Sequence, residues 1–161
     1  NGLALQRASG KRLADDGLNR LWRDMGANDL ARWQEDQQGF AYHESGLVLT
    51  ARDLARFGQI WLEDPDDVIP DAFATDVFTP DARSFARKFG ETSLGYRDGW
   101  WILKAPDGSE DLLGMGDHGQ LLLVSPSTNI VMARLGRDGA PETNVQVALR
   151  MQRAAHALSG R

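Results

Sequence analysis

The chain has 161 residues, a formal net charge of -5 and no cysteine. Its length suits one domain or one large part of a bigger domain. The negative charge argues against binding to the phosphates of nucleic acid. The lack of cysteine excludes disulfides, thiolate catalysis and thiolate zinc sites. We also find no run of about 18 apolar residues, so no membrane span is expected.

The first third of the sequence predicts two helices. Residues 4–10 form a helix that ends at Gly10, since glycine is favoured directly after a helix C-terminus. Leucine and tryptophan then recur at helical spacing over residues 13–25 and predict a second helix. The following segment, 29–39, is polar and predicts a loop.

The clearest predicted helix spans residues 50–62. Thr50 is a hydroxyl N-cap, and Asp53 is an acid at the third helical position, which together form a variant of the capping box. Leu54 and Phe57 belong to a single apolar face of this helix. The prolines and aspartates that follow predict a loop-rich stretch with short helical pieces.

From residue 94 onward the pattern changes to strands. Apolar runs separated by turn signals predict an antiparallel meander with strands at 100–103, 111–113, 120–125 and 130–135. A final helix begins at Thr143. The predicted fold class is therefore α+β, an antiparallel sheet with flanking helices. We divide the chain into a helical and loop region, 1–93, and a sheet region with the last helix, 94–161.

Several well-known chemical motifs are missing from the sequence. It contains no Ser-x-x-Lys, no Gly-x-Ser-x-Gly and no Walker loop. Residues 114–119 spell Gly-x-Gly-x-x-Gly, but a strand follows where the dinucleotide-binding motif needs a helix. The histidines lack metal-ligand spacing. We therefore predict no cofactor and no metal.

The histidines are interpreted in the context of their neighbours. His43, Glu44 and Ser45 are adjacent, whereas the members of a catalytic triad usually come from distant elements. We interpret them as a polar turn before the Thr50 helix, with a nucleophilic centre as the alternative. His156 lies among alanines in the last helix and is interpreted as a packing residue.

The most unusual stretch is Gly116–Gln120, directly before an apolar strand. Glycines at this point suit a ligand that approaches the backbone, or N–H groups that point into a cleft. A tight hairpin with a bulge also requires glycine, and the two interpretations stay open. Trp100 and Trp101 alternate on one strand, so one can pack in the core while the other faces a cleft.

Four segments, in the same order along the chain, carry a resemblance. Leu21–Gly26 resembles "LW-x-PLGM", Ser45–Gly58 resembles "GGL-x-x-TARDLARFG", Gly95–Trp101 resembles "GYG-x-WW", and Gly116–Gln120 with the two strands after it resembles "G-x-GGQ…v-x-P…lVvv". These are elements of the serine β-lactamase-like hydrolases. The resemblance is nearest to the branch of the 6-aminohexanoate-dimer hydrolases and class C β-lactamases.

The resemblance implies a fold and a mechanism. The fold would be the C-terminal portion of a β-lactamase/transpeptidase-like domain. In this family a serine, activated by the lysine of Ser-x-x-Lys, forms an acyl-enzyme, a tyrosine helps move protons, and a third box borders the cleft. Only the third box has a counterpart here, and it implies catalytic roles for Asp117, His118 and Gly119, with the Asp117 or His118 N–H as oxyanion donor. Substrate binding is expected from Tyr42, Trp101 and Gln120.

The sequence also departs from the family pattern. Ser45 replaces a glycine, His118 stands where many relatives have glycine, and Ser-x-x-Lys and the tyrosine box would precede Asn1. The resemblance therefore implies the C-terminal part of a hydrolase for small-molecule β-lactam, linear amide or ester substrates. This part would be inactive without the N-terminal remainder of its domain. Two alternatives are a non-catalytic binding member of the fold and an obligate half that pairs with an upstream chain.

Overall fold

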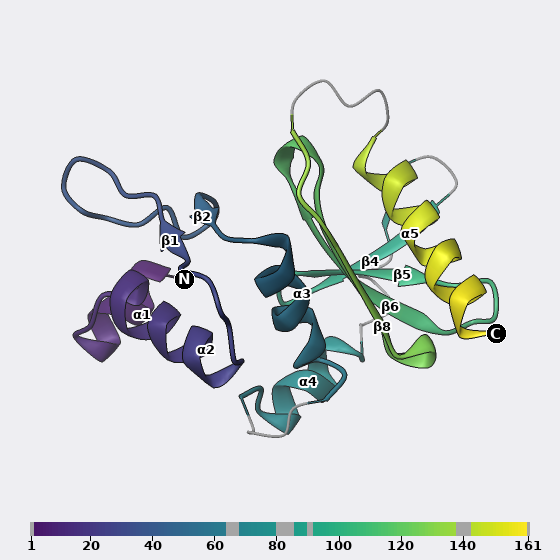
Figure 1. Ribbon diagram of the computed structural model, residues 1–161, viewed down its shortest axis with the longest axis horizontal. Helices are drawn as coiled ribbons and strands as arrows, with labels where there is room; N and C mark the ends of the chain where they lie inside the picture. The colour runs from purple at the N-terminus through teal and green to yellow at the C-terminus, as the bar shows by residue number, and fades with distance from the viewer. Residues whose placement is uncertain (1, 64–67, 80–85, 90–91, 138–142, 161) are drawn as a thin grey trace.

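The computed structural model describes residues 2–63, 68–79, 86–89, 92–137 and 143–160. A helical N-terminal part lies beside a twisted sheet, and the last helix covers one face of that sheet (Figure 1). Within the described ranges, no helix is both long enough and apolar enough to cross a membrane.

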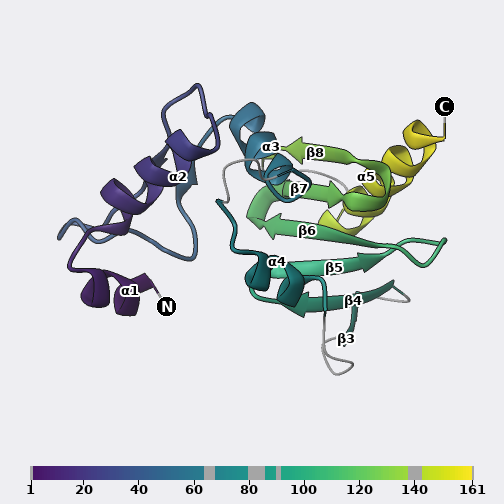
Figure 2. The ribbon, with the colours of Figure 1, turned by 90° about the horizontal axis from the view of Figure 1, so that it is seen from below.

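The sheet is antiparallel, and its six strands follow one another in sequence order (Figure 2). They are β3 (Ala86–Phe89), β4 (Thr92–Arg97), β5 (Trp100–Lys104), β6 (Glu110–Gly116), β7 (Gln120–Ser125) and β8 (Ile130–Arg134). The predicted meander and the α+β class are confirmed. Since β3 and the first part of β4 precede residue 94, the sheet extends across the boundary that we set from the sequence.

Helices cover both faces of the sheet. On one face lies α5 (Asn144–Ser159), which packs on Leu113, Leu121 and Leu123. On the other face, α3 (Ala51–Gln59) and α4 (Asp71–Val77) cover a core built from Trp100, Ile102, Leu112, Leu122 and Val124. Successive residues of each strand therefore alternate between two apolar layers, as a sheet buried on both faces requires.

A single glycine lets α3 lie close to the sheet. A Cβ atom built on Gly58 would lie 2.6 Å from Val131 Cγ1 and 2.9 Å from Leu122 Cδ1, both of which belong to the sheet. Contacts this short do not occur between real side chains, so a larger residue would push α3 outward.

The N-terminal part has an apolar cluster of its own. It contains α1 (Gly2–Ser9), a π-helical turn (Leu13–Gly17), α2 (Leu18–Asp24), and the short strands β1 (Arg32–Trp33) and β2 (Leu47–Val48), which pair. Gly10 follows α1 as predicted, with a left-handed φ of 67°. Strand β1 lies inside the predicted loop. Leu18, Trp22 and Met25 pack on Ile60, which follows α3, and this contact joins the two parts.

Asp53 ties the N-terminal part to α3. The Thr50 hydroxyl accepts a hydrogen bond from the Asp53 N–H at 3.2 Å, which is the predicted cap. The buried Asp53 carboxylate accepts from the N–H groups of Asn28, at 3.2 Å, and Asp29, at 3.1 Å, and pairs with Arg56. Burial raises the pKa of Asp53, but Arg56 and the hydrogen bonds outweigh it and hold this pKa below its usual value.

Candidate functional site

The Gly116–Gln120 stretch is the hairpin between β6 and β7. Gly116 pairs with Gln120, and the three residues between them reverse the chain. His118 and Gly119 have φ values of 58° and 85°, both in the left-handed region. Glycine adopts this conformation without strain, whereas histidine does so at a cost. The hairpin interpretation therefore accounts for Gly119.

The hairpin is held from behind by residues at the end of β8. Arg134 Nη1 donates to the Gly119 carbonyl oxygen at 2.7 Å. The side-chain amide of Gln120 donates to the Gly136 carbonyl and accepts from the Gly136 N–H, both at 3.0 Å. A Cβ atom on Gly136 would lie 2.3 Å from the His118 carbonyl oxygen, so only glycine permits this approach.

A further contact comes from α5, where Asn144 Nδ2 donates to the Gly116 carbonyl at 2.8 Å. Arg134, Gly136 and Asn144 were not predicted from the sequence to contact the hairpin. Gly136, directly after an apolar strand, was the only signal available for these contacts. Arginine and asparagine are common on any protein surface, so their types carried no information. Together these contacts fix the hairpin backbone at both ends.

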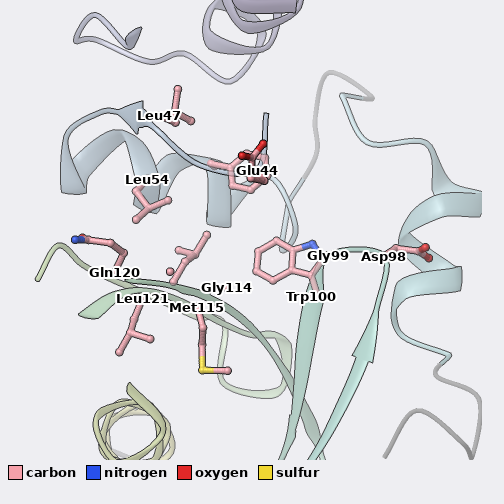
Figure 3. A pocket seen from close by; sticks show the side chains of 13 residues that line it. Glu44, Leu47, Leu54, Asp98, Gly99, Trp100, Gly114, Met115, Gln120 and Leu121 are labelled. Atoms are coloured by element: carbon pink, nitrogen blue, oxygen red, sulfur yellow. The ribbon is translucent and has the colours of Figure 1, made fainter. Parts of the chain in front are cut away.

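A pocket of about 500 Å³ lies in front of the hairpin, between α3 and the sheet (Figure 3). Leu54 and Phe57 of α3 line one side, and Trp100, Gly114 and Gln120 of the sheet line the other. Figure 3 shows the Met115 side chain pointing away from α3, so Gly114 and Gly116 are the β6 residues that face the pocket. Because they have no side chains, the floor of the pocket is open. The ligand-approach interpretation thus suits these two glycines.

A second hollow of about 860 Å³ adjoins the first and shares Glu44, Gly116 and Gln120 with it. It extends between residues 43–48 and the hairpin residues Asp117 and His118. The acidic side chains that line the two hollows are Glu44, Asp98 and Asp117, while none of the described lining residues is lysine or arginine. The combined site is therefore acidic around an apolar floor.

The β4–β5 turn forms another wall of the first pocket. Asp98 and Gly99 have φ values of 48° and 95°, which are typical of a two-residue hairpin turn. Arg97 forms an ion pair with Asp76 of α4 and donates to the Thr79 carbonyl at 2.7 Å. The hydrogen bond from Arg97 holds the pKa of the Asp76 carboxyl below its usual value. The turn and α4 are thereby fixed to each other.

The segment around His43 forms the polar turn that we expected. The Ser45 N–H donates to the Tyr42 carbonyl at 3.0 Å. The His43 ring makes edge contacts with Phe40 and Trp33, at centroid distances of 5.0 and 5.9 Å. Its buried Nε2 atom has no hydrogen-bond partner in the part of the chain that the structure describes. This environment is that of a packed ring and not of a general base paired with Ser45.

The predicted site residues fall into two groups. The hairpin places Asp117, His118 and Gln120 at the second hollow, and Gln120 also lines the first. Gly119 is buried in the turn and lines neither hollow. Trp101 lies on the opposite sheet face, 4.9 Å from Tyr96 between ring centroids, because side chains alternate along β5. The tryptophan in the pocket wall is its neighbour Trp100.

Tyr42 is 43% exposed in the turn before Glu44 and is not among the residues that line either hollow. The sequence analysis assigned no binding role to Glu44, Leu54 or Phe57. For the two apolar residues the only signal was the apolar face of a helix, which predicts burial in general. For Glu44 there was only its place beside the segment Ser45–Gly58. Among the described residues, no group of three or more His, Asp or Glu side chains is arranged to hold a metal ion.

No family model matches the chain. Its sequence is similar to the 6-aminohexanoate-dimer hydrolase of Paenarthrobacter ureafaciens, with 29% identity over 147 residues, which is 86% of this chain and 37% of the relative. Its fold is similar to a solved structure from Bacillus anthracis, provisionally assigned as a 6-aminohexanoate-dimer hydrolase. That match has a TM-score of 0.84 and 24% identity, and it covers 99% of this chain and 42% of the other. The chain thus spans less than half the length of both proteins. The resemblance to the 6-aminohexanoate-dimer hydrolases that the four sequence segments indicated is confirmed by these comparisons.

Proposed function

We propose that the chain is the C-terminal part of a serine hydrolase that cleaves amide or ester bonds through an acyl-enzyme. The nucleophilic serine and its lysine would be supplied by residues before Asn1. The observation that carries the proposal is the fixed Gly116–Gln120 hairpin beside an open pocket, in a chain similar in sequence to an amide hydrolase. The 37% coverage of that relative is in keeping with a missing N-terminal part.

In this proposal the hairpin supplies the oxyanion hole. The backbone N–H of Asp117 or His118 donates to the oxygen that becomes negative as the acyl-enzyme forms and breaks down. Such donors are effective when they are held in place before the reaction. The contacts of Arg134 and Gly136 with the hairpin provide that rigidity. The His118 imidazole, which is exposed at the hairpin, would bind substrate or adjust the family tyrosine.

The lining of the site favours one class of substrate. Leu54, Phe57 and Trp100 offer an apolar surface, and Glu44 and Asp98 add negative charge. β-Lactams carry a carboxylate, which these groups would repel. A linear amide with an aliphatic chain and a neutral or cationic end fits better. We therefore propose linear amides ahead of β-lactams as substrates.

The nucleophile is tested first. The coding sequence upstream of Asn1 should contain an intact Ser-x-x-Lys, and the full-length protein should react covalently with a fluorophosphonate probe. Replacing that serine by alanine should abolish labelling, whereas Ser45→Ala should leave labelling intact and serves as the matched control. If Ser-x-x-Lys is absent or the wild-type protein is not labelled, the chain is a non-catalytic binding member of the fold.

The substrate class is tested with the same protein. Glu44→Gln should raise KM for a linear amide with an ammonium end by about 10-fold, which corresponds to about 1.4 kcal/mol of lost binding. The value of kcat should change little, because Glu44 lies at the rim of the site and not at the hairpin. An uncharged ester of the same length should be hydrolysed equally well by both forms. A β-lactam hydrolysed faster than any linear amide would contradict the preference.

A further inference from the structure

Polar side chains meet beneath α5, at the end of β6 and β7 that lies away from the pockets. Asp111 of β6 and Ser125 of β7 are both 0% exposed, and Gln152 of α5 is 3% exposed. Gln152 Nε2 donates to Asp111 Oδ2 at 2.7 Å, and His156 Nε2 lies 3.3 Å from the same oxygen. Gln152 also donates to the Leu103 carbonyl at 3.3 Å. These contacts tie α5 to the sheet through buried polar groups.

Two atoms of this cluster stand out. Asp111 Oδ1 and Ser125 Oγ are buried, and neither has a hydrogen-bond partner within the described ranges of the chain. A buried oxygen without a partner is strongly unfavourable, and native proteins nearly always provide one, often as an ordered water. Each atom alone is an exception, but two such atoms on neighbouring strands point to a shared partner.

The sheet register places Asp111 and Ser125 opposite each other on neighbouring strands. Leu112 pairs with Val124, so Asp111 and Ser125 are the next residues along the two strands. They share the sheet face of Leu113 and Leu123, which lies under α5. Beyond them the two strands end, and Ser127 Oγ, in the 3-10 turn that follows β7, donates to Ser109 Oγ at 3.2 Å. Directly opposed residues have Cβ atoms about 4.5–5.5 Å apart.

We propose that one water molecule binds between Asp111 and Ser125. It donates one hydrogen bond to Asp111 Oδ1 and forms a second with the Ser125 hydroxyl. A metal cation suits the position less well, because Ca²⁺ and Mg²⁺ take at least about six ligands, and among the described residues of this cluster two oxygens lack a partner. With this water, both unpartnered oxygens of the buried polar cluster beneath α5 have a hydrogen-bond partner.

The residue types invite comparison with a catalytic triad, which also consists of serine, histidine and aspartate. Here the aspartate contacts the imidazole of His156, but Ser125 is fully buried under α5 and out of reach of any substrate. The cluster therefore has a structural role and not a catalytic one. The water site stands independently of any hydrolase activity.

The direct test is a crystal structure of the full-length protein at a resolution that reveals ordered water. We expect a density peak within about 2.6–3.2 Å of both Asp111 Oδ1 and Ser125 Oγ. A direct hydrogen bond between these two oxygens, or no density between them, would overturn the proposal.

The sign of a mutational effect gives a second test. With the bridging water present, Ser125→Ala removes a hydrogen bond and should lower the midpoint of thermal unfolding by about 2–4 °C. If the hydroxyl instead lacks any partner, its removal leaves the midpoint unchanged or raises it, and the proposal fails. Ser127→Ala is the matched control, since this serine is exposed in the turn directly after β7. The unfolding midpoint of this variant should change by less than about 1 °C.

Discussion

The two ends of the β6–β7 pair differ in residue type and in burial. At one end, Gly116 lines both hollows and His118 lines the second, while Arg134 and Asn144 hold the hairpin backbone. At the other end, Asp111 and Ser125 are fully buried beneath α5, and Gln152 of that helix donates to Asp111. One strand pair therefore ends in an exposed glycine-containing hairpin on one side and in a buried polar cluster on the other, and only the first end borders the two hollows described above.

The largest stability effect is expected at the buried end. Asp111→Ala removes the acceptor of Gln152 and the neighbour of His156. Leaving buried polar groups without partners should lower the free energy of unfolding by about 3 kcal/mol. Urea denaturation measures this effect. Asp117→Ala, at an exposed position of the hairpin, is the control. An equal loss of unfolding free energy in both variants would contradict the difference between the two ends.

The next effect is expected at the hairpin and should reach both stability and activity. A Cβ atom on Gly119 would lie 2.2 Å from Arg134 Nη1, and φ there is 85°. Gly119→Ala should cost about 2 kcal/mol and should reduce kcat in the full-length protein.

Gly108→Ala is the control for this prediction. Gly108 has a similar φ of 87°, but a Cβ atom there would meet no atom within 4 Å. It should therefore cost only the backbone strain, about 1 kcal/mol, and leave kcat unchanged. Equal effects of the two substitutions would show that the Arg134 contact does not matter.

A smaller effect, dependent on pH, is expected from Asp53. Since its pKa is lowered in the folded state, its contribution is present above the ordinary value of 3.8 and is lost as pH falls through the lower folded value. Asp53→Asn should be less stable than the wild type by about 1–2 kcal/mol at pH 7. The gap should narrow below about pH 4 in denaturation measured against pH. An equal gap at every pH would contradict this, and Asp71→Asn, on the exposed surface of α4, is the control.

The smallest stability effect is expected at His118. The side chain is exposed at the hairpin, so His118→Ala should change the free energy of unfolding by less than about 0.5 kcal/mol. If the imidazole takes part in substrate binding or proton transfer, turnover by the full-length enzyme should fall by about 10-fold or more. His118→Gly should reduce turnover equally while relieving the left-handed backbone. Unchanged kinetics in both variants would leave only the backbone N–H with a role.

Local signals in the sequence predicted the elements that depend on neighbouring residues. The Thr50 cap, the helix that starts after Thr143 and the strand Gln120–Ser125 all appear where the sequence indicated. The start of each helix is determined by a side chain that caps it, and the strand is bounded by turns directly beside it. The candidate hairpin Gly116–Gln120 was found for the same reason.

Contacts between distant residues were beyond such signals. Gln152 and Asp111 lie 41 positions apart, and Arg134 and Gly119 lie 15 apart. His156 was expected to be a packing residue, and its contact with Asp111 depends on how α5 crosses the sheet. The choice between Trp100 and Trp101 also needed the sheet, because alternation along a strand does not say which face carries which helix.

Gly58 influences the size of the pocket although it does not line it. Because α3 rests directly on β7 and β8 at this point, Leu54 and Phe57 are held at a fixed height above Gly114. A single methyl group at position 58 would push α3 away from the sheet and so move Leu54 and Phe57 away from Gly114. The height of the pocket is therefore set by a core residue that is not among those lining it.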